Sequence, residues 1–314
     1  MKKNILLIHT GGTISMQLNM ETGGVILSAA NPLALEIDKV QQFAKITEME
    51  AFNLPSPHIT PHHMLTLKMM IDQQTESSDF DGIVITHGTD TLEETAYFLE
   101  LSTDYSIPIV LTGAMRSSNE IGADGVYNLM SAVRVAADDE ASNKGVLVVL
   151  NDEIHTATNV TKTHSSSVST FQSPQYGPIG IVTKSAIHFH HAPLSRIFLP
   201  VGSICKKVAM FKIYAGMESD MLHSAASLGY DGVVLEGLGQ GNVPPALLTG
   251  IQHLLDEDIP VILVSRCFNG IAQDIYAYEG GGKMLKDLGV RFEHGLSGQK
   301  ARLKLLLELC SGRS

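Results

Sequence analysis

The feature of this sequence that most restricts its fold is a recurring order: a short apolar run, a turn, and a segment with helical periodicity. The apolar runs are continuous and rich in Ile, Leu and Val, which is typical of strands buried on both faces of a sheet. They cover residues 5–8, 82–87, 108–111 and 145–150. Helical patterns cover residues 60–71, 92–101 and 124–137. Strands that alternate with helices predict a parallel sheet with helices on both faces.

Other stretches of the N-terminal half show different patterns. Residues 46–54 alternate like a strand, and residues 31–43 predict a helix with Asn31 as its cap and Pro32 in its first turn. Residues 15–30 are rich in Gly, Ser, Asn and Thr and have no period, so they predict a mobile loop. Residues 151–180 are expected to be irregular or hairpin-like.

The length of 314 residues favours two domains. Phe80–Ile85 resembles Tyr230–Leu235, and each is followed by a helix-length segment, an Ile-Pro pair and another strand, which supports an α/β structure in both halves. A proline-containing stretch without a period separates the halves. We therefore predict an N-terminal α/β domain over residues 1–190, a linker over 191–207 and a smaller C-terminal α/β domain over 208–314.

Charge and composition narrow the class of protein. The formal net charge of −11 argues against a nucleic-acid surface and against docking on anionic lipid. The first apolar run is too short for a signal-peptide core, and no apolar stretch is long enough to span a membrane. Cys205, Cys267 and Cys310 are widely spaced, as expected for reduced thiols. Together these features predict a cytoplasmic protein.

The turn Gly88–Thr91 places two hydroxyls and a carboxylate after a buried strand. In open α/β sheets ligands bind at this carboxyl end of the strands. The alternative is that Thr89 or Asp90 only caps the following helix, whose first turn holds Glu93 and Glu94. This turn alone favours the cap.

Two more turns of this kind, Thr10–Thr13 and Thr112–Arg116, follow buried strands. In a parallel sheet all three lie along one edge and can converge on one ligand. Gly11 and Gly12 permit a tight turn and leave Thr13 at its exit. The sequence contains neither the glycine pattern of a dinucleotide site nor that of a P-loop.

A threonine hydroxyl is a poor nucleophile unless a base takes its proton. Lys162 is the candidate base if burial keeps it neutral, with Asp90 orienting it and Thr89 bridging the two. Spacing alone does not establish this relay, and a structural role for Lys162 is the alternative that spacing favours.

Six segments resemble, in order, motifs of the bacterial-type L-asparaginase/glutaminase family. They are His9–Ile14, His87–Thr91, Thr112–Arg116, Ala123–Leu129, Thr161–Thr163 and Gln299–Arg302. The resemblance covers nearly the whole chain. It implies a larger flavodoxin-like N-terminal domain, a smaller α/β C-terminal domain, and hydrolysis of L-asparagine to L-aspartate and ammonia through a threonine acyl-enzyme.

The resemblance also implies roles for individual residues. Thr13 is similar to the family's nucleophile, and Thr89, Asp90 and Lys162 to its second catalytic group. Substrate-binding roles are implied for Ser56, Thr89, Asp90, Ala114 and Asn242, with Asn242 lent by a neighbouring subunit of a homo-oligomer, usually a tetramer. No metal or organic cofactor is implied, and the histidine clusters at 62–63 and 188–191 lack metal-ligand spacing.

The sequence departs from the family pattern in three places. Residues 15–30 lack the tyrosine that helps to activate the nucleophile in many members. Pro57 and His58 replace a polar residue and an aspartate, and the acidic group lent by the second subunit matches neither Tyr276 nor Glu279 clearly. Three alternatives remain: a glutaminase-asparaginase of mixed specificity, a non-catalytic amino-acid sensor, and a subunit of a tRNA-dependent amidotransferase.

Overall fold

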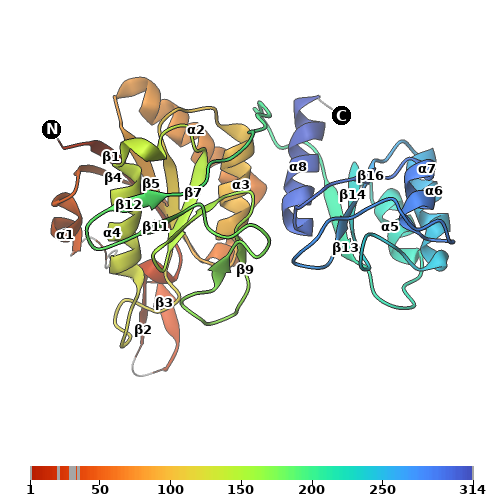
Figure 1. The fold of residues 1–314 in the computed structure, drawn as a ribbon, viewed down its shortest axis with the longest axis horizontal. Helices are drawn as coiled ribbons and strands as arrows, with labels where there is room; N and C mark the ends of the chain where they lie inside the picture. The colour runs from red at the N-terminus through yellow and green to blue at the C-terminus, as the bar shows by residue number, and fades with distance from the viewer. Residues whose placement is uncertain (1, 20–21, 28–32, 34–35, 313–314) are drawn as a thin grey trace. The chain divides into compact units, whose positions relative to one another are not determined.

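The computed structural model describes residues 2–19, 22–27, 33 and 36–312. The chain divides into two compact units, Met1–Phe198 and Leu199–Ser314, and the division falls inside the predicted linker (Figure 1). Arg196 lies just before it and pairs with Glu100 at 2.9 Å, so this part of the predicted linker is bound to the first unit.

The first unit contains an eight-stranded sheet in the order β12-β11-β8-β7-β6-β5-β1-β4. Its parallel part is formed by β1 (Asn4–Gly11), β4 (Lys45–Leu54), β5 (Gly82–Thr86), β6 (Ile109–Thr112) and β7 (Val146–Leu150). Numbered along the chain, these strands lie in the flavodoxin-like order 2-1-3-4-5. The predicted fold class is therefore confirmed. The order reverses between β1 and β5, which is the switch point where such sheets bind ligands.

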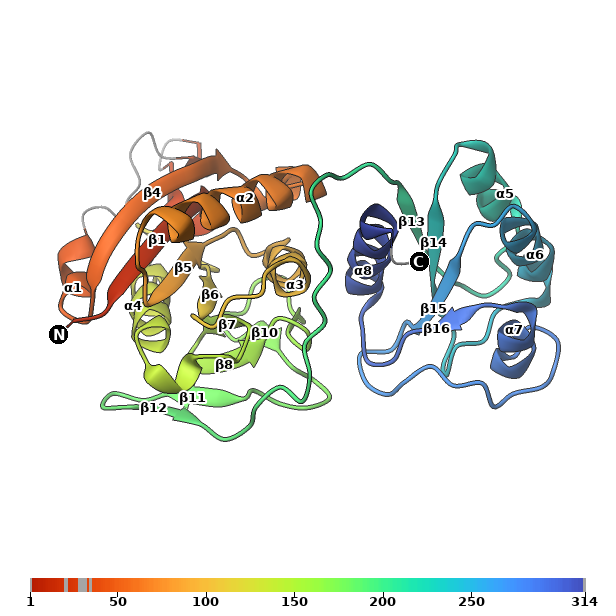
Figure 2. The same cartoon turned by 90° about the horizontal axis from the view of Figure 1, so that it is seen from above.

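Helices cover both faces of this sheet (Figure 2). On one face Ile5 and Leu7 share a core with α1 (Ile37–Gln41) and α4 (Gly125–Ala136). On the other, Leu6 and Ile8 share a core with α2 (Pro61–Ser77) and α3 (Leu92–Ser102). Successive residues of β1 thus pack into opposite layers. Burial of each of these large apolar side chains contributes about 1.5–3 kcal/mol.

The sheet is mixed rather than purely parallel, which corrects one expectation. The strands β8 (Glu153–Thr156), β11 (Gly180–Val182) and β12 (Ile187–Phe189) extend it in antiparallel pairing. Asn151 and Asp152, with φ of 50° and 65°, form the two-residue turn from β7 to β8. Positive φ at both turn residues suits a tight hairpin, so the hairpin alternative for this region is confirmed.

The region after β1 also differs from the prediction. A 3₁₀ turn, η1 (Thr13–Ser15), leads into a hairpin of β2 (Met16–Leu18) and β3 (Val25–Leu27), so the prediction of an irregular loop is wrong for these strands. Residues 20, 21 and 28–30 lie outside the described residues. So do Asn31 and Pro32, the predicted start of a helix whose described part is α1.

The second unit is a four-stranded parallel sheet with helices. Its strands are β13 (Val208–Lys212), β14 (Gly232–Gly237), β15 (Val261–Ser265) and β16 (Arg291–Phe292). Its helices are α5 (Asp220–Ser227), α6 (Leu248–Asp256), α7 (Gly282–Leu288) and α8 (Gly298–Ser311). The run β14-α6-β15 repeats the order of β5-α3-β6, as the sequence similarity predicted. Within the described part of the chain, no helix combines the length and apolar character needed to span a membrane.

Candidate active site

The turns after β1 and β5 touch through their glycine backbones. A Cβ added to Gly12, which has φ of 84°, would lie 2.2 Å from the Gly88 Cα. Only glycine permits both this backbone conformation and this approach. The amide of Gly12 also donates to the Leu54 carbonyl at 3.0 Å, which ties the turn to the end of β4. Thr13 and Thr89 each follow this glycine contact by one residue.

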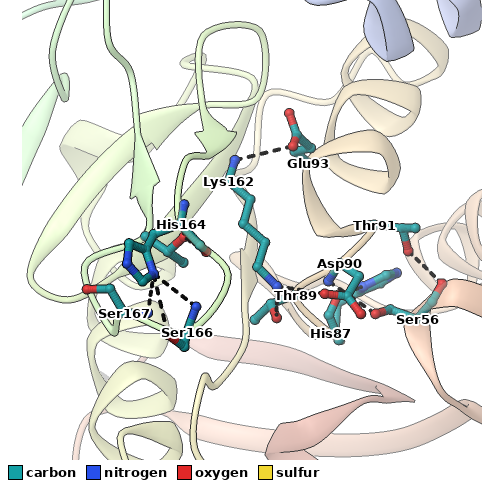
Figure 3. A network of polar contacts seen from close by, with 12 residues as sticks. Ser56, His87, Thr89, Asp90, Thr91, Glu93, Lys162, His164, Ser166 and Ser167 are labelled. Carbon is teal, nitrogen blue, oxygen red and sulfur yellow. Dashed lines mark hydrogen bonds and ion pairs between the residues drawn. The ribbon is translucent and has the colours of Figure 1, made fainter.

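Ser56 joins the same cluster from η3 (Ser56–His58), just after β4. Its Oγ accepts a hydrogen bond from the Asp90 amide at 3.2 Å, and its carbonyl accepts one from the Thr91 hydroxyl at 2.8 Å (Figure 3). A Cβ added to Gly88 would lie 2.7 Å from the Ser56 Oγ, so a side chain at 88 has no room. Segments after three neighbouring strands thus meet at the switch point.

Thr89 and Asp90 do not cap helix α3. The N-cap residue is Thr91, which makes no side-chain capping hydrogen bond, and the helix itself begins at Leu92. Thr89 is buried, whereas the Asp90 side chain is 59% exposed. The interpretation of these two residues as caps is therefore wrong, and the Asp90 carboxylate is accessible to a ligand.

Lys162 approaches this turn from the short strand β9 (Thr161–Lys162). Its Nζ donates to the Thr89 Oγ1 at 3.0 Å and to the Asp90 Oδ1 at 2.6 Å. Lys162 lies more than 70 residues from both partners in sequence, and its side chain is only 15% exposed. The structure thus brings together the three residues that the sequence analysis grouped.

His87 lies beneath the turn as a neutral, structural side chain. Its Nδ1 donates to the Gly88 carbonyl at 2.8 Å, and since a carbonyl only accepts, Nε2 is left to accept from the Thr95 hydroxyl at 2.9 Å. Burial lowers the pKa of His87 to about 4, because desolvation disfavours the imidazolium. His87 is therefore a hydrogen-bonded structural residue beneath the turn.

Ala114 is buried in the turn after β6, and Asp124 holds that turn. The Asp124 carboxylate accepts from the amides of Met115, at 3.1 Å to Oδ2, and Arg116, at 3.0 Å to Oδ1. The Arg116 guanidinium, by contrast, donates to the Gly122 carbonyl. The Asp124 carboxylate also accepts a second bond from the Met115 amide and one from the Asn128 side-chain amide, so its observed bonds hold the turn in place.

Asn242 belongs to the second unit, beyond β14. Its Oδ1 accepts from the Gly282 amide at 3.2 Å, at the start of α7, and its backbone pairs with Leu238. Tyr276 and Glu279, the two positions considered for an acidic partner, are both exposed. Asn242 thus has a local contact within its own unit, and the first-unit residues form their cluster separately.

Glu93 also belongs to this cluster, although its place in the sequence predicted only a role at the start of the helix. It is buried and accepts from the Lys162 amide and the Thr161 hydroxyl, both at 3.2 Å. Its position in the first turn of an apolar helix, followed by a second glutamate, gave no sign that it would reach a strand far along the chain.

Comparisons with known proteins agree over both units. Residues 4–195 match the family model "Asparaginase, N-terminal", and residues 207–314 match "Glutaminase/Asparaginase C-terminal domain". A probable L-asparaginase of Deinococcus radiodurans is 40% identical, over 99% of this chain and 94% of its own length. An L-asparaginase of Bacillus licheniformis is 33% identical, over 99% and 97%. The crystal structure of a probable cytoplasmic L-asparaginase from Campylobacter jejuni superposes with a TM-score of 0.87 at 32% identity, covering 98% of this chain and 95% of that one.

Proposed function

Because this chain belongs to the asparaginase/glutaminase family, we infer that it hydrolyses L-asparagine to L-aspartate and ammonia. One observation carries the assignment at the level of the site. Lys162, Thr89 and Asp90 are joined by hydrogen bonds of 3.0 and 2.6 Å at the switch point of the sheet, beside the turn that carries Thr13.

In the proposed reaction the Thr13 hydroxyl attacks the side-chain amide carbon of asparagine. Its proton passes to Lys162 in the amine form, with the Thr89 hydroxyl as bridge and Asp90 as orienter. Collapse of the tetrahedral intermediate breaks the carbon–nitrogen bond, and the leaving nitrogen takes a proton and departs as ammonia. Water then attacks the Thr13 ester by the same route and releases aspartate. Backbone amides of the adjoining turns are the candidate donors to the oxyanion.

We propose that the substrate's charged groups bind to the exposed side of this cluster. Asp90 is accessible and suits the α-ammonium group, while the Ser56 hydroxyl suits the α-carboxylate. Ala114, in the turn fixed by Asp124, offers a backbone carbonyl for the leaving amide. The reaction as proposed needs neither a metal nor an organic cofactor.

The finer details of assembly and location are also proposals. We propose a homo-oligomer, a tetramer of intimate dimers, in which Asn242 of one chain completes the site of its partner. A cytoplasmic location is supported by the similarity to the C. jejuni protein, which is described as probably cytoplasmic, although a relative from Haemophilus influenzae is described as probably periplasmic.

Two observations favour other functions. The matched C-terminal family is described as glutaminase as well as asparaginase, which favours mixed specificity. The lack of a tyrosine between residues 15 and 30 favours a non-catalytic amino-acid sensor. Comparison of kcat/KM for asparagine and glutamine distinguishes mixed specificity from a preference for asparagine. Calorimetric binding of either amide without ammonia release would support the sensor.

The test is an ammonia-release assay with L-asparagine, L-glutamine and their D-forms, on wild-type protein and Thr13→Ala. We expect the variant to bind aspartate and keep its melting temperature while turnover falls by about 10⁴-fold or more, since no other hydroxyl replaces the nucleophile. Thr13→Ser, which keeps a hydroxyl, is the matched control and should retain measurable turnover. Appreciable activity of Thr13→Ala would remove Thr13 from this role.

A further inference from the structure

The proposed base, Lys162, is carried by a strand that pairing alone holds weakly. Strand β9 contains two residues, and its partner β10 (Phe171–Gln172) contains two more. An isolated two-stranded ribbon of this length is marginal in water. Hydrogen bonds from the amides of Thr163 and His164 to Thr170 continue the ribbon, and residues 164–167 then form a largely exposed loop in which the His164 ring accepts from two backbone amides (Figure 3). The amide of Lys162 itself donates to a partner outside this ribbon.

Glu93 makes that connection. Its Oε1 accepts from the Lys162 backbone amide and from the Thr161 hydroxyl, each at 3.2 Å, and its side chain is buried. A buried side-chain oxygen without hydrogen-bond partners is costly, so these two bonds matter more than they would at the surface. The contact therefore fixes the backbone of β9 against the first turn of α3.

Both ends of Lys162 are thereby bound to one short segment. The backbone amide is held by Glu93, and the Nζ is held by Thr89 and Asp90. These three partners lie within five consecutive residues, 89–93, at the turn and first helical residues after β5. We propose that Glu93 is a positioning residue, which sets the distance between the Lys162 amine and the Thr89 hydroxyl by holding the lysine backbone. This inference rests on the proposed role of Lys162 in catalysis.

The test compares Glu93→Gln with Glu93→Ala. The glutamine oxygen can still accept both hydrogen bonds, so kcat should stay within about threefold of wild type. The alanine variant removes the two hydrogen bonds that hold β9 against α3, and kcat should fall by about 10- to 100-fold, as expected when a reacting group shifts by an ångström. KM should change less than kcat, because Ser56 and Asp90 remain. Circular dichroism and melting temperature measure whether each variant is folded.

The double variant Glu93→Ala/Lys162→Met distinguishes a positioning role of Glu93 from a general disturbance of the fold. If Glu93 acts through the lysine amine, Glu93→Ala should cause no further loss of kcat in a Lys162→Met background, because residues that act as a unit are not additive. The inference would be overturned if the double variant lost kcat by the product of the two single losses. It would also be overturned if Glu93→Ala kept a wild-type kcat while Lys162→Met was inactive. An active Lys162→Met would instead overturn the proposed role of Lys162 and this inference with it.

A second inference comes from an independent observation in the second unit. The Sγ atoms of Cys205 and Cys310 lie 3.8 Å apart, although the residues are 105 positions apart in sequence. The Cys205 amide also donates to the Cys310 Sγ at 3.4 Å. An ion pair from Lys206 to Asp231 at 2.9 Å and a hydrogen bond from the Lys207 amide to the same carboxylate fix the segment that carries Cys205. Cys205 is exposed, so an oxidant can reach the pair.

We infer that Cys205 and Cys310 form a reversible disulfide with a small disulfide oxidant such as glutathione disulfide. One cysteine thiolate attacks a sulfur of the oxidant and releases one glutathione thiolate. The second cysteine thiolate then displaces the other glutathione, so that two protein thiols are oxidised and one glutathione disulfide is reduced to two thiols. The bond joins the segment before β13 to the last turn of α8 and closes a loop over almost the whole second unit, which stabilises the fold by restricting the unfolded chain.

The folded protein is incubated with glutathione disulfide and measured by intact mass and peptide mapping. We expect a loss of two hydrogens, a Cys205–Cys310 cross-linked peptide, and a melting temperature raised by several degrees and restored by reduction. Cys310→Ser should abolish the cross-link, whereas Cys267→Ser, which removes the third thiol, should leave it unchanged. Glutathione adducts without a cross-link in wild-type protein, or a cross-link through Cys267, would overturn the inference.

Discussion

At the scale of single residues, the contact between Lys162 and Asp90 has two possible meanings that a substitution separates. An ion pair needed only for structure requires a positive charge, whereas a general base requires a group that can take up and release a proton. Arginine satisfies the first requirement and not the second, because its guanidinium is always charged. Because the Lys162 Nζ lies 2.6 Å from the Asp90 carboxylate and the lysine side chain is largely buried, replacing Lys162 by arginine or methionine tests these two requirements separately.

We therefore predict that Lys162→Met and Lys162→Arg both lower kcat by about 10²- to 10⁴-fold, the range typical of a lost acid–base group. The arginine variant should keep a melting temperature close to wild type, since it can still pair with Asp90. Steady-state ammonia release and calorimetry measure the two effects. A Lys162→Arg variant with nearly full activity would assign the lysine to structure.

His87 provides a prediction of pH dependence at the same scale. Burial lowers its pKa to about 4 in the folded protein, against 6.5 for the free side chain. Between these values the unfolded chain binds a proton that the folded chain excludes, so His87 makes the free energy of unfolding rise with pH across this window. The full contribution is about 3 kcal/mol, present above pH 6.5 and lost as the pH falls towards 4.

Replacement by glutamine, which is uncharged at every pH, should remove that contribution. We expect the difference in unfolding free energy between about pH 7 and about pH 4.5 to be smaller in His87→Gln by about 2 kcal/mol. Urea denaturation followed by circular dichroism provides the measurement. Some slope should remain, since burial also lowers the pKa of His9. An unchanged pH dependence would contradict the neutral, buried state of His87.

A contact between residues far apart in the sequence could be predicted where the proposed chemistry implied a partner. A threonine nucleophile needs a base, and that requirement led to Lys162, which the structure places against Thr89 and Asp90. The contact of Glu93 with β9 was not predicted because one donor is the backbone amide of Lys162, which leaves no mark in residue type, and the other is a threonine hydroxyl, which can pair with many acceptors. Thr89 and Asp90 looked like helix caps for a similar reason: the true N-cap, Thr91, is an equally suitable residue one position later.

At the scale of elements, the contact between the turns after β1 and β5 depends on two glycines. A side chain at position 12 would have to occupy the Gly88 backbone, 2.2 Å from its Cα, so one of the turns must move. We predict that Gly12→Ala lowers stability by about 2 kcal/mol or more and lowers kcat by at least about 10-fold, because the shift separates Thr13 from Thr89. Thermal unfolding and ammonia release measure both.

Gly177 provides the matched control for that substitution. Its φ of 73° is close to that of Gly12, but an added Cβ would meet no atom within 4 Å. Gly177→Ala therefore carries the conformational cost of positive φ, about 1 kcal/mol, without the steric clash. Similar losses in both variants would show that the backbone conformation alone, and not the close approach of the two turns, accounts for the effect.

The elements that the sequence predicted well are those with strong burial. The apolar runs became β1, β5, β6 and β7, since strands covered on both faces have little room for polar residues. The hairpin of β2 and β3 was missed because its strands are only three residues long and Val25 and Ile26 are exposed. Short strands of this kind depend on pairing rather than on a periodic apolar face, and pairing is not visible in one segment of sequence.

At the scale of the whole molecule, the sequence indicated two units and the structure divides the chain at residues 198 and 199. The predicted site residues are distributed over both: Thr13, Ser56, Thr89, Asp90, Ala114 and Lys162 belong to the first unit, and Asn242 belongs to the second. The first-unit cluster follows from sheet topology, which the alternating pattern predicts. The proposed contribution of Asn242 to a partner's site depends on assembly, which no periodicity in a single chain encodes.

Subunit mixing tests the proposed sharing of the site. If Asn242 acts on the partner's substrate, a Thr13→Ala chain still supplies Asn242, and an Asn242→Ala chain still supplies Thr13. A heterodimer of the two therefore contains one intact site and one with both defects. Co-expression of the two variants, each nearly inactive alone, should restore about a quarter of wild-type activity, because half of randomly paired dimers are mixed.

A second variant at Asn242 distinguishes loss of a shared site from a folding defect of the alanine variant. The Asn242 Oδ1 accepts from the Gly282 amide, so alanine also removes a local contact at the start of α7. Asn242→Asp keeps an oxygen acceptor there and should match wild type in melting temperature. If mixing either Asn242 variant with Thr13→Ala restores no activity while mixed dimers are demonstrated by native mass spectrometry, each site is completed within a single chain and the shared-site proposal is wrong.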